Sequence, residues 1–155
     1  MNTLRTRLAC AALLCAAAGL ATAADAATAL QLPKLAISWN CKEKTCTQNE
    51  KVAPLIEEAY AAAARKGGYA VSETETAAID ITDFRQRSPG TRVMLGLFAG
   101  KDRLAVQGSY HGRNVSAEDS SGNAVQGMNH LCEAVGRKLY AAVLAKARED
   151  QPAAK

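Results

Sequence analysis

The feature that most constrains the fold is a stretch of alternating residues over 104–118. Apolar residues or glycine recur at every second position on both sides of a break at Gly112-Arg113. Such alternation is typical of strands that bury one face and leave the other in water. A glycine in the first position of a two-residue loop favours a type II′ turn. The sequence therefore predicts a β-hairpin with the cross-strand pairs Tyr110–Val115 and Gly108–Ala117.

The other periodic segments predict a mixed fold. Alternation indicates strands over 34–39 and 77–84, and apolar stripes of helical spacing indicate amphipathic helices over 50–66 and 125–148. Gly67-Gly68 follows the first helix, where glycine forms a left-handed cap without strain. A one-sided sheet and two amphipathic helices can bury each other's apolar faces. We therefore expect an α+β fold, a two-layer sandwich in which a mainly antiparallel sheet of about three to five strands carries both helices on one face.

A short apolar run, residues 93–98, has no periodicity that distinguishes a strand from a loop. It is bracketed by five basic residues: Arg85, Arg87, Arg92, Lys101 and Arg103. Apolar segments with basic flanks can contact a membrane surface or an anionic polymer, so these five residues are a candidate surface contact. The alternative is a buried core strand with solvated ends. We favour the core strand.

The N-terminus has the three parts of a cleavable signal peptide. Arg5 and Arg7 precede an apolar core over 8–20, and the small residues 21–23 form a cleavage site. Cleavage after Ala26 is a close alternative to cleavage after Ala23. Lipid anchoring through Cys15 is a second alternative, but Leu14 occupies the position where a small residue is expected. We expect an exported soluble protein.

Length and charge indicate a single exported domain. Removal of residues 1–23 from the 155-residue chain leaves 132 residues and lowers the net charge from +4 to +2. We expect a disordered leader over 24–33, one domain over 34–149 and a disordered tail over 150–155. So small a net charge does not suggest a nucleic-acid partner. The composition, rich in alanine and arginine, is typical of bacteria, and export then places the protein in the periplasm.

Three cysteines remain after processing. The spacing of Cys41 and Cys46 permits a local disulfide, which an oxidising compartment favours. A metal-binding or redox pair is the alternative, although metal motifs usually space two cysteines more closely and add a second pair. Cys132 lies on the apolar stripe of the last helix, which predicts a buried thiol. Pairing of Cys132 with either of the other two cysteines remains open.

No catalytic constellation stands out in the sequence. It contains no Gly-x-Ser-x-Gly, His-Glu-x-x-His or phosphate-binding glycine loop. Asp80 and Asp83 are three positions apart on a predicted strand, which would place them on opposite faces. His111 and His130 are interpreted as exposed residues. We expect a non-enzymatic protein without cofactor or bound metal.

Residues 77–110 carry a recognisable pattern. It reads Ile-Asp-Ile-Thr-Asp-Phe-Arg-x-Arg over 79–87 and Arg-x-Met-x-Gly-x-x-Ala-Gly-Lys-Asp-x-Leu-x-Val over 92–106. This pattern resembles a family of proteobacterial periplasmic and envelope proteins of unknown function, many of which are lipoproteins. The resemblance implies a location in the cell envelope and implies no activity. The expected function is therefore a periplasmic binding or envelope-accessory module whose partner is an unknown protein or envelope component. A metal or redox protein using Cys41 and Cys46 is the alternative.

Overall fold

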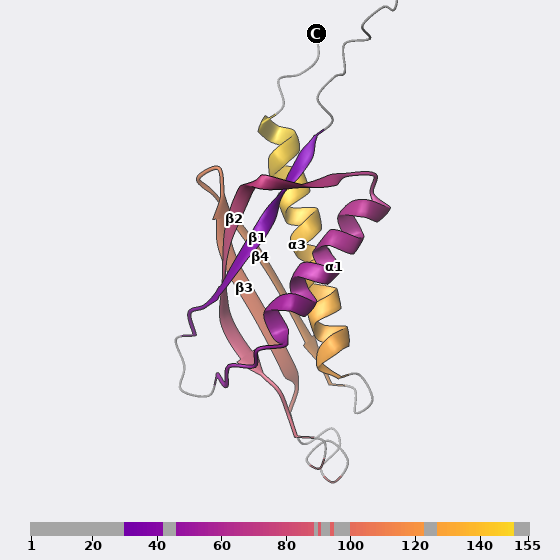
Figure 1. The fold of residues 1–155 in the computed structure, drawn as a ribbon. Coiled ribbons are helices and arrows are strands. Elements are labelled where there is room, and N and C mark those ends of the chain that lie inside the picture. The colour runs from indigo at the N-terminus through magenta and orange to yellow at the C-terminus, as the bar shows by residue number, and fades with distance from the viewer. Residues whose placement is uncertain are drawn as a thin grey trace, which may run out of the picture.

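The structure is a computed structural model and describes residues 30–41, 46–88, 90, 94, 100–122 and 127–150. Four strands and two helices make up this part of the chain (Figure 1). In chain order they are β1 (Gln31–Trp39), α1 (Val52–Lys66), β2 (Ala70–Arg85), β3 (Asp102–Tyr110), β4 (Arg113–Ser121) and α3 (Met128–Asp150).

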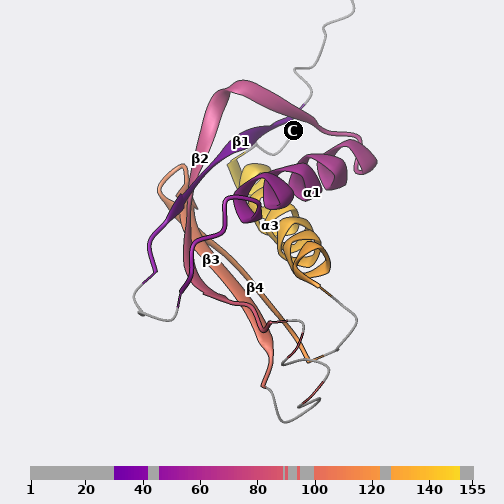
Figure 2. The ribbon, with the colours of Figure 1, turned by 60° about the horizontal axis from the view of Figure 1, so that its bottom comes forward.

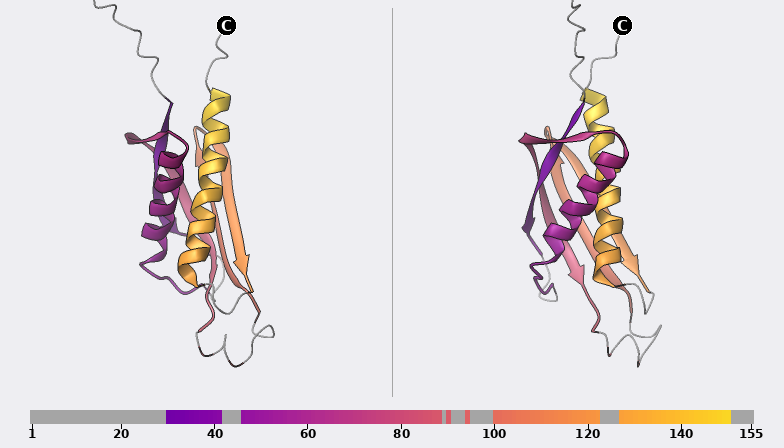
Figure 3. Two further views of the ribbon diagram at one scale, coloured as in Figure 1. Left: turned by 90° about the vertical axis from the view of Figure 1, so that its right-hand side faces the viewer. Right: turned by 45° about the vertical axis from the view of Figure 1, so that its right-hand side comes forward.

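The strands form one sheet in the order β1-β2-β3-β4. β1 is parallel to β2 because α1 carries the chain back between them, whereas the β2–β3 and β3–β4 pairs are antiparallel. Both helices lie on the same face of the sheet, and no other helix of the described elements covers the opposite face (Figure 3). The expected α+β fold with a mostly antiparallel sheet and two helices is confirmed, and one parallel pair makes the sheet mixed.

The core lies between the helices and the sheet. Helix α1 contributes one stripe of fully buried residues at helical spacing, which are Val52, Ile56, Tyr60 and Ala64. Helix α3 crosses α1 closely at Gly136, where a Cβ atom would lie 2.6 Å from the Cβ of Ala59 and 2.7 Å from the Ile56 carbonyl oxygen. Only a residue without a side chain permits this approach. Amphipathic helices are thus confirmed in both predicted segments, each with a buried apolar stripe.

The hairpin is present, but its turn and register differ from the prediction. The loop residues are His111 and Gly112, with φ of 49° and 73°, and two positive φ values define a type I′ turn rather than type II′. Tyr110 pairs with Arg113 and Gly108 with Val115, so the predicted register is wrong by two residues. A shift of two keeps every side chain on its own face, since strand side chains alternate with period two. The apolar pattern therefore could not detect the error.

β2 is longer than the predicted strand over 77–84 and bends along its length (Figure 2). Its pairing with β1 shifts between Leu32 and Lys34, where β2 accommodates extra residues. The Ser72 hydroxyl accepts hydrogen bonds from the N–H groups of Thr74 (3.2 Å) and Glu75 (3.1 Å) within this irregularity. The polar residues of this segment thus form a local turn-like contact inside a continuous strand.

β1 starts at Gln31, three residues before the predicted start at Lys34. Leu32 is fully buried, so the last residues of the predicted leader belong to the fold. Pro33 was not included in the predicted strand because proline has no N–H to donate to a neighbouring strand. It is tolerated here because β1 is an edge strand.

Several predictions fall outside the described residues. These are the signal peptide over 1–23, residues 24–29 of the leader, and the tail beyond Asp150. Of the 93–98 run only Met94 is described, and its helical backbone and 86% exposed side chain contradict a core strand at that position. Among the described helices, none is both long and apolar enough to cross a membrane.

Candidate functional site

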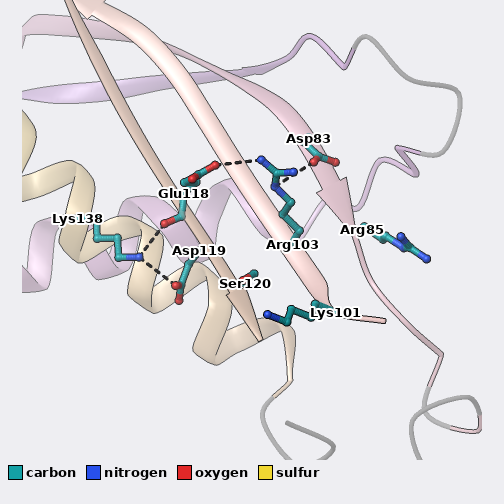
Figure 4. A pocket seen from close by; sticks show the side chains of 8 residues that line it. All are labelled: Asp83, Arg85, Lys101, Arg103, Glu118, Asp119, Ser120 and Lys138. Atoms are coloured by element: carbon teal, nitrogen blue, oxygen red, sulfur yellow. Dashed lines mark hydrogen bonds and ion pairs between the residues drawn. The ribbon is translucent and has the colours of Figure 1, made fainter. Parts of the chain in front are cut away.

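A charged hollow is lined by side chains from β2, β3, β4 and α3 and by Lys101, just before β3 (Figure 4). Its volume is about 830 Å³. The lining residues are Asp83, Arg85, Lys101, Arg103, Glu118, Asp119, Ser120 and Lys138. We refer to this hollow as the charged cleft.

The sheet register brings the charged cleft together. Arg85 is the cross-strand neighbour of Arg103, which in turn faces Ser120 on β4. One step along the sheet, Asp83 and Glu118 flank Ala105 in the same way. Residues directly opposite each other on adjacent strands have neighbouring side chains, so three strands contribute to one charged surface.

A bulge in β2 places Asp83 and Arg85 on the open face of the sheet. The β2–β3 pairing shifts between Ile81 and Asp83, and both Ile81 and Phe84 are buried although they are three positions apart. A bulge adds one residue to one strand and so reverses the alternation beyond it. Asp80 and Asp83 therefore share the open face, and the prediction that they lie on opposite faces is wrong.

The acidic side chains of the charged cleft all have basic partners. Arg103 Nε lies 3.3 Å from Asp83, and its Nη2 lies 3.0 Å from Glu118, so one guanidinium joins two strands on either side of β3. Lys138 reaches from α3 to Asp119 at 2.9 Å and to the Glu118 carbonyl oxygen at 2.7 Å. The acids are therefore neutralised within the charged cleft.

Two cations of the charged cleft have no such partner. Arg85 and Lys101 are exposed, and neither side chain makes an ion pair or hydrogen bond with another described residue. Lys101 extends toward Ser120, and Arg85 extends in the opposite direction, toward the outer rim (Figure 4). Arg85 also lines a second hollow, of about 730 Å³, beside residues 47–51. The surplus positive charge is thus spread along a strip rather than concentrated at one point.

The structure separates the five predicted contact residues. Arg85, Lys101 and Arg103 lie together in the charged cleft, and Arg92 is outside the described residues. Arg87 is 6% exposed and lies 3.2 Å from the buried carboxylate of Asp102, so its assignment to a surface contact is wrong. Arg87 is held inside because its backbone N–H and its guanidinium both donate to Asp102.

Sequence reasoning missed the acidic residues of the charged cleft and Lys138. Nothing in their local sequence identifies them, because they come from β2, β4 and α3 and meet only through the register of the sheet. Lys138 occupies the exposed face of an amphipathic helix, where a lysine is ordinary. The alternation of polar residues over 116–120 predicts a solvent-exposed face of a strand, but it does not predict a charged site there.

The predicted disulfide between Cys41 and Cys46 is present. Both cysteines pack against the core, and Cys41 Sγ lies 3.5 Å from the Ile81 carbonyl oxygen. The disulfide thus closes a short loop just after β1, beside β2. Cys132 is a free thiol, fully buried on α3, and burial raises its pKa to about 11. This confirms the buried thiol and excludes its pairing with the other two cysteines in this structure.

Both histidines are exposed, as predicted. His111 lies at the hairpin turn, stacked on Tyr110, with its Nδ1 3.0 Å from an Asp150 carboxylate oxygen. The described residues contain no group of three or more His, Cys, Asp or Glu side chains placed to hold a metal ion. Comparison with protein-family models and with curated proteins gives no match for this chain.

Proposed function

We propose that this protein is an exported, non-enzymatic binding module that recognises a partner protein through the charged cleft. The observation that carries the proposal is the pair of exposed cations, Arg85 and Lys101, beside acids that are already neutralised. Such a surface attracts the acidic groups of a partner. Export rests on the N-terminal segment over 1–23, and a closed disulfide is the state that an oxidising compartment maintains.

The charge pattern favours a protein over a membrane or an anionic polymer. Lipid-binding patches usually gather about four to eight basic residues. Among the described residues that line the charged cleft only two cations are unpaired, and Asp83, Glu118 and Asp119 lie among the basic residues. Four basic and three acidic side chains leave the charged cleft with a net charge of only +1, which would bind a uniformly negative surface weakly, whereas a protein surface with charges of both signs can complement it. The partner is therefore a protein that presents acidic side chains with basic neighbours.

Capture from an envelope extract tests the proposal. The test variant is Arg85→Glu/Lys101→Glu. The matched control is Arg65→Glu/Lys66→Glu, which changes the net charge equally at the exposed end of α1. We expect a protein that is bound by the wild type and the control but lost with the test variant, and whose retention weakens as salt rises.

Two results would contradict the proposal. One is equal capture by the test and control variants. The other is salt-sensitive sedimentation of the wild type with phosphatidylglycerol vesicles together with no variant-dependent protein, which would make a lipid surface the ligand.

A further inference from the structure

The two edge strands of the sheet differ in how far other elements cover them. β4 lies beneath α3 (Figure 3). Lys138 of that helix donates a hydrogen bond to the Glu118 carbonyl oxygen on β4 at 2.7 Å. β1 forms the other edge and, within the described part of the chain, pairs with β2 alone. An uncovered edge presents main-chain donors and acceptors to another strand, and proteins usually block it with charges, proline or a covering element.

The first half of β1 is blocked in this way. Pro33 has no N–H to offer, and its carbonyl oxygen accepts a hydrogen bond from the buried Tyr60 hydroxyl at 2.9 Å. Lys34 follows with an exposed charge. Strand addition is therefore disfavoured at this end of the edge.

The second half of β1 is open. Asn40 donates its N–H to the Ile81 carbonyl oxygen at 2.9 Å, so the main-chain groups of Asn40 point toward β2. Because main-chain groups alternate in direction along a strand, those of Ala36 and Ser38 also point to β2. The N–H and C=O groups of Leu35, Ile37 and Trp39 then point outward, and none of them has a partner among the described residues.

The side chains of this open half are uncharged and sorted by face. Leu35, Ile37 and Trp39 lie on the helix side, and Ile37 and Trp39 are only partly buried there. Ala36 and Ser38 lie exposed on the other side. A strand added at this edge would cover the remaining apolar surface of Ile37 and Trp39.

The side chains of residues 35–39 match those of a second copy when the two strands pair antiparallel. In an antiparallel pair centred on Ile37, Leu35 faces Trp39 of a second copy and Ala36 faces Ser38 of that copy. Apolar residues then meet apolar residues on the helix side, and small residues meet small residues on the open side. Each of the outward-facing residues exchanges both of its main-chain hydrogen bonds with the residue opposite. The arrangement has the two-fold symmetry of an isologous dimer.

We propose that β1 pairs with β1 of a second copy across residues 35–39 and joins the two four-stranded sheets into one. The charged cleft contains no β1 residue, so this dimer does not depend on the proposed function and leaves that cleft free.

Two double variants that differ at one residue test the pairing. Ala36→Lys/Ser38→Lys places lysine opposite lysine twice, whereas Ala36→Glu/Ser38→Lys places glutamate opposite lysine twice. Residues 36 and 38 are exposed, and the lysine at 38 neighbours Asp80 in both variants, so both should fold alike by circular dichroism. Sedimentation equilibrium then measures the average molecular mass of each protein over about a hundredfold range of protein concentration.

We expect the wild-type mass to rise toward that of a dimer with concentration. The Lys/Lys variant should dimerise about tenfold more weakly, and the Glu/Lys variant should retain the dimer. A synthetic peptide spanning Lys34–Asn40 should compete and return the wild type to monomer. Equal dimerisation of the two variants would overturn the register. A wild-type mass that stays monomeric throughout, even if a foreign alternating peptide binds this edge, would overturn the assignment of a second copy.

Discussion

The Arg87 guanidinium lies 3.2 Å from the Asp102 carboxylate at a place where both side chains are only 3% exposed. Arg87 also donates through its backbone N–H to Asp102 at 2.7 Å and through Nη2 to the Ser121 carbonyl oxygen at 3.2 Å. One residue just past β2 is thus joined to the start of β3 and to the end of β4. The pair closes the sheet at the end where the charged cleft lies.

Removal of this arginine should destabilise the protein strongly. Arg87→Met would remove one ion-pair partner of the buried Asp102 carboxylate, and breaking a buried pair costs about 3–5 kcal/mol. Urea unfolding measures the change in the free energy of unfolding. The control is Arg103→Met, which removes exposed ion pairs and should cost no more than about 1 kcal/mol. If the two variants lose similar free energies of unfolding, the buried Arg87–Asp102 pair contributes no more to stability than the exposed ion pairs of Arg103.

Gly108 should not tolerate a side chain. A Cβ atom there would lie 2.0 Å from the Ala78 carbonyl oxygen and 2.8 Å from the Cα atom of Ile79, so the backbones of β2 and β3 would have to separate. We expect Gly108→Ala to lower the free energy of unfolding by about 1–3 kcal/mol or more. At Gly122 a Cβ atom would meet only Lys101 Cγ, at 3.9 Å, among the residues that the structure describes. Gly122→Ala is therefore the control, and thermal unfolding of both variants gives the comparison.

The buried thiol of Cys132 should make stability depend on alkaline pH. Burial raises its pKa from 9.0 to about 11, so the folded state keeps a proton that the unfolded state loses. The stabilisation from this group is fully present below pH 9.0 and is lost as the pH rises toward 11. Burial also raises the pKa of Tyr110, to about 12, so tyrosines contribute in a neighbouring range. Urea midpoints of wild type and Cys132→Ala between pH 8 and 11 isolate the thiol, and identical pH profiles would contradict the prediction.

The disulfide should contribute to stability and be visible by thiol counting. In the chain processed after Ala23, denatured protein should show one thiol before reduction, Cys132, and three thiols after it. Replacing both Cys41 and Cys46 by alanine should lower the free energy of unfolding by about 2 kcal/mol, because the bond closes only a short loop. Three thiols without reductant, together with stoichiometric metal by elemental analysis, would instead support a metal-binding protein.

Local sequence determined much of the fold. Residues 104–121 form a hairpin because alternation and a glycine turn are local properties, and the helices follow from apolar spacing within each segment. The proximity of Cys41 and Cys46 likewise needs only a short loop. The turn type was misjudged because His111 adopts a positive φ, which histidine tolerates better than most residues but which no pattern marks.

Only the tertiary structure decided which charges are exposed and which are buried. Arg85 and Arg87 are two positions apart with the same side chain, yet one lies at the rim of the charged cleft and the other is buried against Asp102. The β2 bulge sets the face of Arg85, and the approach of β3 supplies the carboxylate for Arg87. Both depend on residues distant in the chain, so the charge pattern of one segment contains no information about them. The hydrophobic pattern thus determined the layers of this protein, and the pairing of its strands determined its charged surface.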